Sequence, residues 1–222
     1  MLRSVFESML LSMYLFREAV NQKEILHLFH EHVFFARVVI PVTIDLAALN
    51  DQQNPFQNSN YQFVEINLSD LRDRNLSFSI RSRYFKAMRN IKKGLRGFIL
   101  LNNDTVISDI WCVVPQIRNL PVRYPDLDML GITCTDGDIY ALDMFIDPAY
   151  RGKKLAVPIH QSLQLTLKRE GWRRIYAYYY EDNISSKWMH FMLKFKELPK
   201  LRVSRFFFII KTYNSIPTNP SV

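Results

Sequence analysis

The residues with the clearest chemical potential lie in the segment DMFIDPAYRGKKLAVPIHQSLQ (143–164). An apolar, strand-like run ends in Asp-Pro, the turn RGKK (151–154) follows, and an apolar-periodic helix comes next. The first-turn amides of a helix have no partner inside it, and the helix dipole adds positive charge there. The spacing therefore predicts a phosphate site in the basic turn, residues 151–156, with a solvated surface turn as the alternative.

Lys154 is the unusual residue of the basic turn, because a second small residue is expected at its position. Its backbone still supplies an N–H group, and its side chain would point to solvent or contact a phosphate. In the alternative, its Cβ crowds the ligand and binding is weakened or lost. We favour retained binding.

Strands and helices must alternate to position this turn. A hairpin is expected at 102–104, Ser69 is the expected N-cap of the first helix after residue 60, and a Pro-rich loop is expected at 115–136. The pattern predicts a mixed α/β fold on a largely antiparallel sheet. Strands are expected at 61–67, 95–101, 105–114, 137–146, 173–181 and 200–213, and helices at 68–73, 81–93, 156–170 and 183–197.

The chain has 222 residues, which suits one domain or one domain with an appendage. We expect an N-terminal extension at 1–50, helical at first and then a strand at 32–46, a polar loop at 51–60, a domain at 61–212 and a tail at 213–222. The N-terminal segment is apolar but interrupted by charges, which predicts an amphipathic helix and neither a signal peptide nor a transmembrane span. That helix could pack on the domain, on a second copy in a homodimer, or on a membrane surface.

Composition narrows the partners without choosing one. The net charge is +8, and 48% of the residues are hydrophobic. A basic globular protein suits an anionic partner such as a polyphosphate cofactor, an acidic carrier protein, an anionic lipid or a nucleic acid. Cys112 and Cys134 lack metal-ligand spacing and form no disulfide framework, so we expect no metal and a cytoplasmic location.

The basic turn resembles the acyl-CoA-binding motif of the GNAT acetyltransferase superfamily. That motif is Arg or Gln, two residues, Gly, one residue, and Gly or Ala, usually after V-x-P-x-Y. The motif's central glycine is Lys154 in this chain. The residues that match are Pro148, Tyr150, Arg151, Gly152 and Ala156.

A second match follows the strand expected at 173–181. GNAT enzymes often have N-x-x-S-x-x-x-Y-x-K-x-G-F there, and this chain has NISSKWMHFMLKF. Asn183, Ser186 and Phe195 fall in register, while His190 replaces the tyrosine and Lys194 the glycine. The resemblance covers about residues 61–212.

The resemblance implies an acyltransferase fold whose fourth strand splays away from the fifth. Backbone groups of Met144, Phe145 and Ile146 would then hold the pantetheine arm of acetyl-CoA or another acyl-CoA and polarise its thioester. Asn183 and Ser186 would assist. The pyrophosphate would lie on the basic turn, whose implied contacts are Arg151, Gly152, Lys153, Lys154, Leu155 and Ala156.

Three residues are candidates for proton transfer. His190 stands where the family has its usual acid, and a histidine can protonate a leaving thiolate at neutral pH. The alternative is a helical histidine without a role. Asp143, within a strand, or Glu181, at a strand end, could act as the base, although Glu181 could equally be a solvated strand end.

Three functions follow. The first is an N-acyltransferase that moves an acyl group from acyl-CoA to an amine of unknown identity. The second uses an acidic acyl carrier protein as donor, which the charge and the basic helix at 81–93 would suit. The third is a degenerate domain that binds nucleic acid or another anionic surface, which is less favoured because no separate nucleic-acid motif is present.

Overall fold

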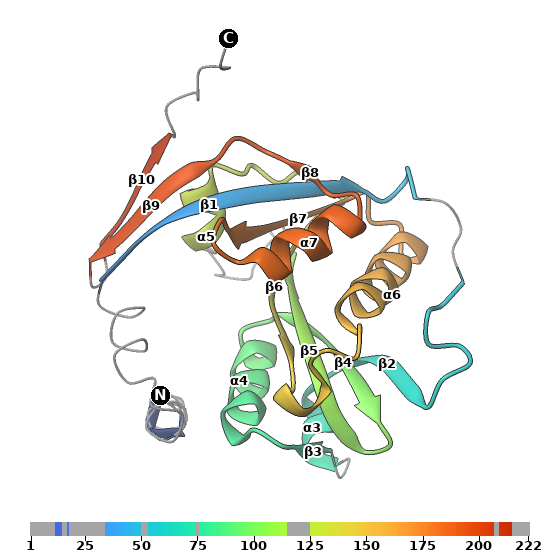
Figure 1. The fold of residues 1–222 in the computed structure, drawn as a ribbon. Helices are drawn as coiled ribbons and strands as arrows, with labels where there is room; N and C mark the ends of the chain where they lie inside the picture. Colours follow the sequence, from blue (N-terminus) through green and yellow to red (C-terminus); the bar gives the residue numbers. More distant parts are fainter. Residues whose placement is uncertain are drawn as a thin grey trace.

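The computed structural model describes residues 12–14, 17, 34–49, 53–73, 76–114, 125–206 and 209–214. In this part of the chain ten strands form one sheet in the order β10-β9-β1-β7-β6-β5-β4-β2, while β3 pairs with β5 and β8 with β1 (Figure 1). The strands are β1 (Phe34–Asp45), β2 (Tyr61–Ile66), β3 (Ser77–Phe78), β4 (Arg96–Asn102), β5 (Thr105–Val113), β6 (Asp138–Ile146), β7 (Arg174–Tyr180), β8 (Lys196–Glu197), β9 (Leu201–Phe206) and β10 (Ile209–Asn214).

The predicted class, a mixed α/β fold on a largely antiparallel sheet, is confirmed. The pairs β6–β7 and β3–β5 are parallel, and the other pairs are antiparallel. The helices are α3 (Leu68–Asp73), α4 (Arg81–Lys92), α5 (Pro125–Leu130), α6 (Ala156–Arg169) and α7 (Ile184–Met192), with a short 3-10 turn, η1, at Pro148–Tyr150.

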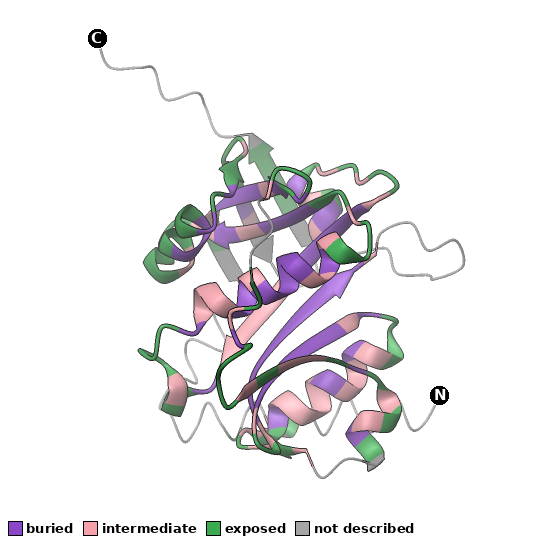
Figure 2. Cartoon of the chain, turned by 90° about the vertical axis from the view of Figure 1, so that its right-hand side faces the viewer, coloured by how far each residue is buried: buried purple, intermediate pink, exposed green. Residues whose placement is uncertain are grey.

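Helices cover both faces of the sheet, and each face has its own hydrophobic core. One core includes Ile159 of α6 and Met189 of α7, and the other includes Ala87 of α4 and Leu127 of α5. Buried residues run along the central strands, and exposed residues gather at turns and on outer helix surfaces (Figure 2). Such packing of apolar area is the main favourable contribution to folding, and it holds α4 and α6 on opposite sides of β6.

The predicted hairpin forms between β4 and β5. Asn103 adopts a left-handed conformation with φ 52°, which asparagine tolerates better than most residues. Gly97 lies opposite Trp111, and a Cβ at Gly97 would come within 2.5 Å of the indole ring. The fully buried Trp111 therefore requires glycine on the neighbouring strand.

Two predicted local features are wrong. The N-cap of α3 is Asn67, not Ser69, because Asn67 Oδ1 accepts hydrogen bonds from the amides of Ser69 (2.8 Å) and Asp70 (3.1 Å). The Pro-rich loop contains helix α5, and residues 115–124 of that loop lie outside the described residues.

The helix predicted at 183–197 ends early, at Met192. Lys194 has φ 58°, a left-handed conformation that cannot continue an α-helix, and β8 begins at Lys196. The strand expected at 200–213 forms as two, β9 and β10.

The strand predicted at 32–46 forms as β1 and lies inside the sheet, between β7 and β9. Val42 pairs with Ala177, for example, so this part of the predicted extension belongs to the same sheet as residues 61–212. The other domain boundaries stay a prediction. The predicted N-terminal helix and the tail beyond residue 214 lie almost wholly outside the described residues.

Among the described residues, no helix is long and apolar enough to cross a membrane.

Candidate functional site

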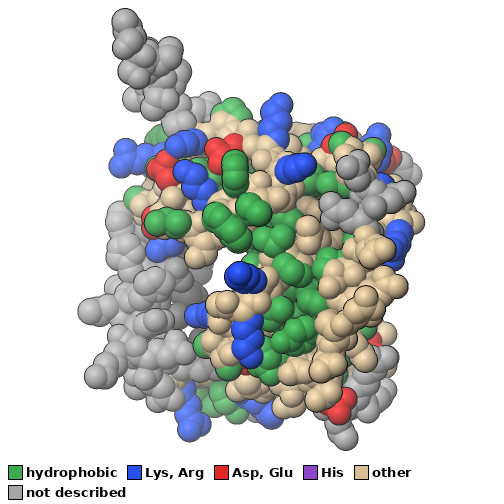
Figure 3. Space-filling model, turned by 45° about the vertical axis from the view of Figure 1, so that its right-hand side comes forward, with side chains coloured by type: hydrophobic (Ala, Val, Ile, Leu, Met, Phe, Trp, Pro, Cys, Tyr) green, Lys and Arg blue, Asp and Glu red, His purple; other side chains and the backbone are tan. Residues whose placement is uncertain are grey.

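The site begins where two neighbouring strands separate. β6 and β7 pair only where Asp138–Tyr140 of β6 lie beside Arg174–Tyr176 of β7, and beyond these residues the two strands diverge. The splayed central strands that the resemblance to the GNAT superfamily implied are therefore present. The opening is a cavity of about 570 Å³, lined by β6, β7, α4, α6 and α7. Figure 3 shows a hollow between the upper and lower parts of the molecule, with Lys or Arg side chains beside it.

The diverging part of β6 contains the three predicted backbone donors, Met144, Phe145 and Ile146. Within the described residues no strand pairs with them on the side that faces β7. Unpaired strand edges present N–H and C=O groups to a ligand. The register of β6 against β5 shifts next to Asp143, which has φ 49°. This bulge turns β6 away from β7 and widens the opening.

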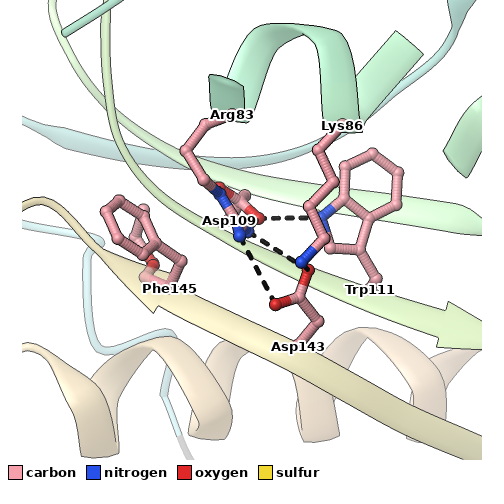
Figure 4. Close-up of polar contacts among 7 residues, drawn as sticks. Arg83, Lys86, Asp109, Trp111, Asp143 and Phe145 are labelled. Atoms are coloured by element: carbon pink, nitrogen blue, oxygen red, sulfur yellow. Dashed lines mark hydrogen bonds and ion pairs between the residues drawn. The ribbon is translucent and has the colours of Figure 1, made fainter. Parts of the chain in front are cut away.

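A charged network holds the bulge in place; it consists of Arg83, Lys86, Asp109 and Asp143 (Figure 4). Arg83 of α4 donates to both oxygens of Asp109, with Nε 3.0 Å from Oδ2, and lies 3.4 Å from Asp143. Lys86 Nζ lies 2.6 Å from Asp143 Oδ2, and Trp111 Nε1 donates to Asp109 at 2.7 Å. Because α4, β5 and β6 each contribute charges, the network ties one helix to two strands.

Asp143 was predicted as a base, and its partners bear on that role. Burial opposes its ionisation, but Arg83 and Lys86 outweigh burial and hold the pKa of Asp143 below its usual range. A carboxylate of lowered pKa accepts protons poorly near neutral pH. The geometry therefore favours Asp143 as a residue that positions the bulge.

The basic turn connects η1 to α6. Asp147 caps η1 by accepting from the amide of Ala149 at 2.8 Å, and α6 begins at Ala156. Within the described part of the chain, the amides of Gly152, Lys154, Leu155 and Ala156 donate no backbone hydrogen bond. The turn thus presents a cluster of unpaired N–H groups at a helix N-terminus, which is the arrangement predicted for a phosphate.

The side chains of the basic turn leave these amides accessible. Arg151 Nε donates to the carbonyl of Ile146 at 3.2 Å, and Lys153 Nζ lies 4.3 Å from the centre of the Tyr150 ring. No atom lies within 4 Å of the position that a Cβ would take at Gly152. Residues 151–154 are all exposed. The space in front of the turn is therefore open.

Both lysines that stand where the GNAT motifs have glycine keep a glycine-like backbone. Lys154 and Lys194 each have φ 58°, and Gly152 has φ 79°. A left-handed conformation costs a residue with a Cβ roughly 1–2 kcal/mol. The chain thus keeps the turn geometry and accepts the strain, and the Lys154 side chain is exposed at the surface.

Helix α7 contributes the second set of predicted residues to the cavity. Asn183 is its N-cap, accepting from the amide of Ser186 at 3.0 Å, and both residues line the opening. His190, two turns from the helix start, is buried and also lines the cavity. The structure therefore brings Asn183, Ser186 and His190 together.

His190 has a defined tautomer. Its Nδ1 lies 2.8 Å from the carbonyl oxygen of Ser186, and a carbonyl can only accept, so Nδ1 bears the proton and Nε2 is an acceptor. Burial lowers the pKa of His190, against the raising effect of that hydrogen bond. The ring is therefore neutral at neutral pH, which disfavours a resting imidazolium that only donates a proton.

His160 of α6 was not foreseen. It is fully buried beside His190, with ring centroids 5.9 Å apart, and it lines the same cavity. Burial lowers the pKa of His160 to about 3, and its Nδ1 has no hydrogen-bond partner. Its place on the apolar face of the predicted helix was the signal, since a histidine in such a stripe is buried.

Glu181 is not brought to the cavity. Its carboxylate pairs with Lys200 Nζ at 2.5 Å on the exposed surface, and it is not among the cavity-lining residues. This geometry matches the alternative of a solvated strand end.

Three solved structures that superpose on this chain are described as acetyltransferases or acetyltransferase regions of the GNAT (GCN5-related) superfamily. A protein of the GNAT family from Novosphingobium aromaticivorans superposes with a TM-score of 0.52 at 10% identity, over 82% of this chain and 66% of that one. A GCN5-related glucosamine N-acetyltransferase region of a fungal multi-domain GH3 beta-N-acetylglucosaminidase gives 0.54 at 11%, over 84% and 23%. A GNAT-family acetyltransferase from Colwellia psychrerythraea gives 0.50 at 10%, over 78% and 56%.

These likenesses define the class of fold. The chain has the fold of the GNAT superfamily, and it spans about two thirds or less of the length of each of these three proteins. No protein-family model matches its sequence, and no curated protein does. The likeness thus lies in the backbone, while sequence identity to these structures is at most 11%.

Proposed function

We propose that this chain is a GNAT-type N-acyltransferase that transfers an acetyl or other acyl group from acyl-CoA to an amine by direct attack. The observation that supports this most is that β6, whose edge toward β7 is unpaired beyond residue 140, leads through η1 into the basic turn. The turn offers unpaired amides to a pyrophosphate, and β6 offers an unpaired edge to an extended arm. A cavity of about 570 Å³ gives the reacting groups room.

Each part of the site has a role in this proposal. Acyl-CoA supplies an activated acyl group. The unpaired amides of the basic turn bind its pyrophosphate, and the β6 backbone at Met144–Ile146 binds the pantetheine arm. Backbone N–H groups of β6 stabilise the negative charge that develops on the acyl oxygen when the amine attacks.

His190 serves the proton transfer. The amine loses one proton and the leaving sulfur gains one, so no net proton is taken up. A neutral imidazole can accept the first proton at Nε2 and return it to the sulfur. The tautomer fixed by Ser186 leaves Nε2 available for this exchange.

The first experiment is calorimetric titration of the protein with acetyl-CoA and with CoA. We expect micromolar binding that Lys154→Glu abolishes, because a carboxylate beside the amides repels the pyrophosphate. Lys211→Glu is the matched control, since it makes the same charge change at an exposed residue of β10. Absence of heat with both ligands contradicts the proposal.

The second experiment addresses chemistry. His190→Gln should reduce kcat by roughly 10²- to 10⁴-fold, the usual contribution of general acid–base catalysis, with little change in acetyl-CoA affinity. Thiol release with a panel of amines measures the rate. An unchanged kcat would remove His190 from the mechanism without affecting the binding proposal.

A further inference from the structure

One face of α4 lines the cavity at the end opposite α6 and α7. Lys86, Arg89 and Asn90 are spaced i, i+3 and i+4, which places them on the same side of the helix, and all three line the cavity. The contact of Lys86 with Asp143 shows that this side faces β6. Tyr178 and Tyr180 of β7 line the cavity as well.

The two cations on this face differ in how their charge is balanced. Lys86 is paired with Asp143 at 2.6 Å. No hydrogen bond or ion pair of the Arg89 side chain occurs among the described residues, and its Nε is out of reach of solvent. A partly buried guanidinium without a partner is costly, and such a group requires an explanation.

Neighbouring carboxylates do not balance Arg89. Asp143 is already held by Lys86 and Arg83. Asp126 of α5 also lines the cavity, but no ion pair joins it to Arg89, and it accepts from the Tyr140 hydroxyl at 3.4 Å. The positive charge of Arg89 is therefore left for a ligand.

We infer that the acceptor is an amine that also bears a carboxylate, and that Arg89 binds this carboxylate. The inference rests on the proposed function, because it assigns the α4 end of the cavity to the acceptor. A guanidinium presents paired N–H donors that match the two oxygens of a carboxylate, which a lysine cannot do. The rings of Tyr178 and Tyr180, with centroids 5.7 Å apart, line the same cavity as Arg89.

The test uses free amino acids as carboxylate-bearing amines and their carboxamides as matched amines that lack the charge. Binding is measured by calorimetry with and without acetyl-CoA, and turnover by thiol release. The proteins are wild type, Arg89→Gln, Arg89→Lys, and Lys93→Gln as the control, because Lys93 is an exposed cation at the end of the same helix.

We expect at least one amino acid to bind more tightly than its amide by roughly 10- to 100-fold, the value of a charge-assisted contact. Arg89→Gln should abolish this preference, Arg89→Lys should restore part of it, and Lys93→Gln should leave it unchanged. Arg89→Gln is expected to fold, because Arg89 has no partner to lose.

The inference is overturned if amino acids and amides bind equally, if no amino acid binds, or if Arg89→Gln keeps the preference. Its failure is distinguishable from failure of the proposed function. Acetyl-CoA binding and turnover without a carboxylate preference contradict only the inference. Carboxylate binding that depends on Arg89, without acetyl-CoA binding, contradicts only the proposed function.

Discussion

The basic turn and the charged network both lie near the C-terminal end of β6, but they are built from different atoms. The turn presents backbone amides, and Lys154, which stands where the GNAT motif has glycine, still keeps a left-handed backbone. The network consists of side-chain charges, each held by a specific partner. A site made of backbone tolerates replacement of side chains, whereas a site made of paired charges does not.

Removing one charge from the network should have the largest effect on stability. Asp109→Ala leaves the buried Arg83 without its bidentate partner, and breaking a buried pair in this way costs about 3–5 kcal/mol. Urea unfolding measures the change. The double variant Arg83→Met, Asp109→Leu removes both charges and should cost clearly less. An equal cost in the two variants would show that the side chains contribute by packing and not by charge.

Acidification should have the next largest effect on stability, through the buried His160 of α6. The pKa of His160 is lowered to about 3 in the folded protein, against about 6.5 when unfolded. Above pH 6.5 the His160 ring is neutral in both the folded and the unfolded state, so stability does not depend on pH. Below pH 6.5 only the unfolded state gains a proton, so the protein becomes less stable as the pH decreases. Between pH 7 and 5 the loss is about 2 kcal/mol.

His160→Leu tests this effect, because it removes the titrating ring and keeps an apolar side chain. Its unfolding free energy should depend less on pH over the same range than that of the wild type. Parallel pH dependences for the two proteins would mean that His160 is not the group responsible.

Relieving backbone strain at Lys154 of the basic turn and at Lys194 after α7 should have the smallest effect, with opposite sign. Lys154→Gly and Lys194→Gly should each stabilise the protein by about 0.5–1 kcal/mol, since glycine adopts φ 58° without a clashing Cβ. Lys153→Gly, in the same turn, is the control and should destabilise. If Lys154→Gly stabilises and acetyl-CoA still binds, backbone alone forms the turn.

Local patterns predicted much of the fold and of the turn. Hydrophobic periodicity and turn residues indicated α4, α6, the β4–β5 hairpin and the strand β6, because these features involve residues close in sequence. The choice of N-cap for α3 depended on side-chain geometry. Asn67 caps the helix in place of Ser69, because its side chain accepts hydrogen bonds from two amides at once.

Ion pairs between residues far apart in sequence could not be predicted from local patterns. Asp143 looked like a base from its place within a strand, but its partners Arg83 and Lys86 lie 60 and 57 residues away in sequence, on α4. The sequence likewise gave no sign that Arg89 would remain unpaired. Charges that meet only in the folded state leave no local pattern.

The exposed basic turn also determines where a protease would act. Arg151, Lys153 and Lys154 place three trypsin-sensitive bonds within four exposed residues, beside a short 3-10 turn. Loop tips of this kind are preferred sites of nicking. A ligand bound to the same amides would cover these bonds, so the rate of tryptic cleavage between β6 and α6 reports occupancy of the turn without any label.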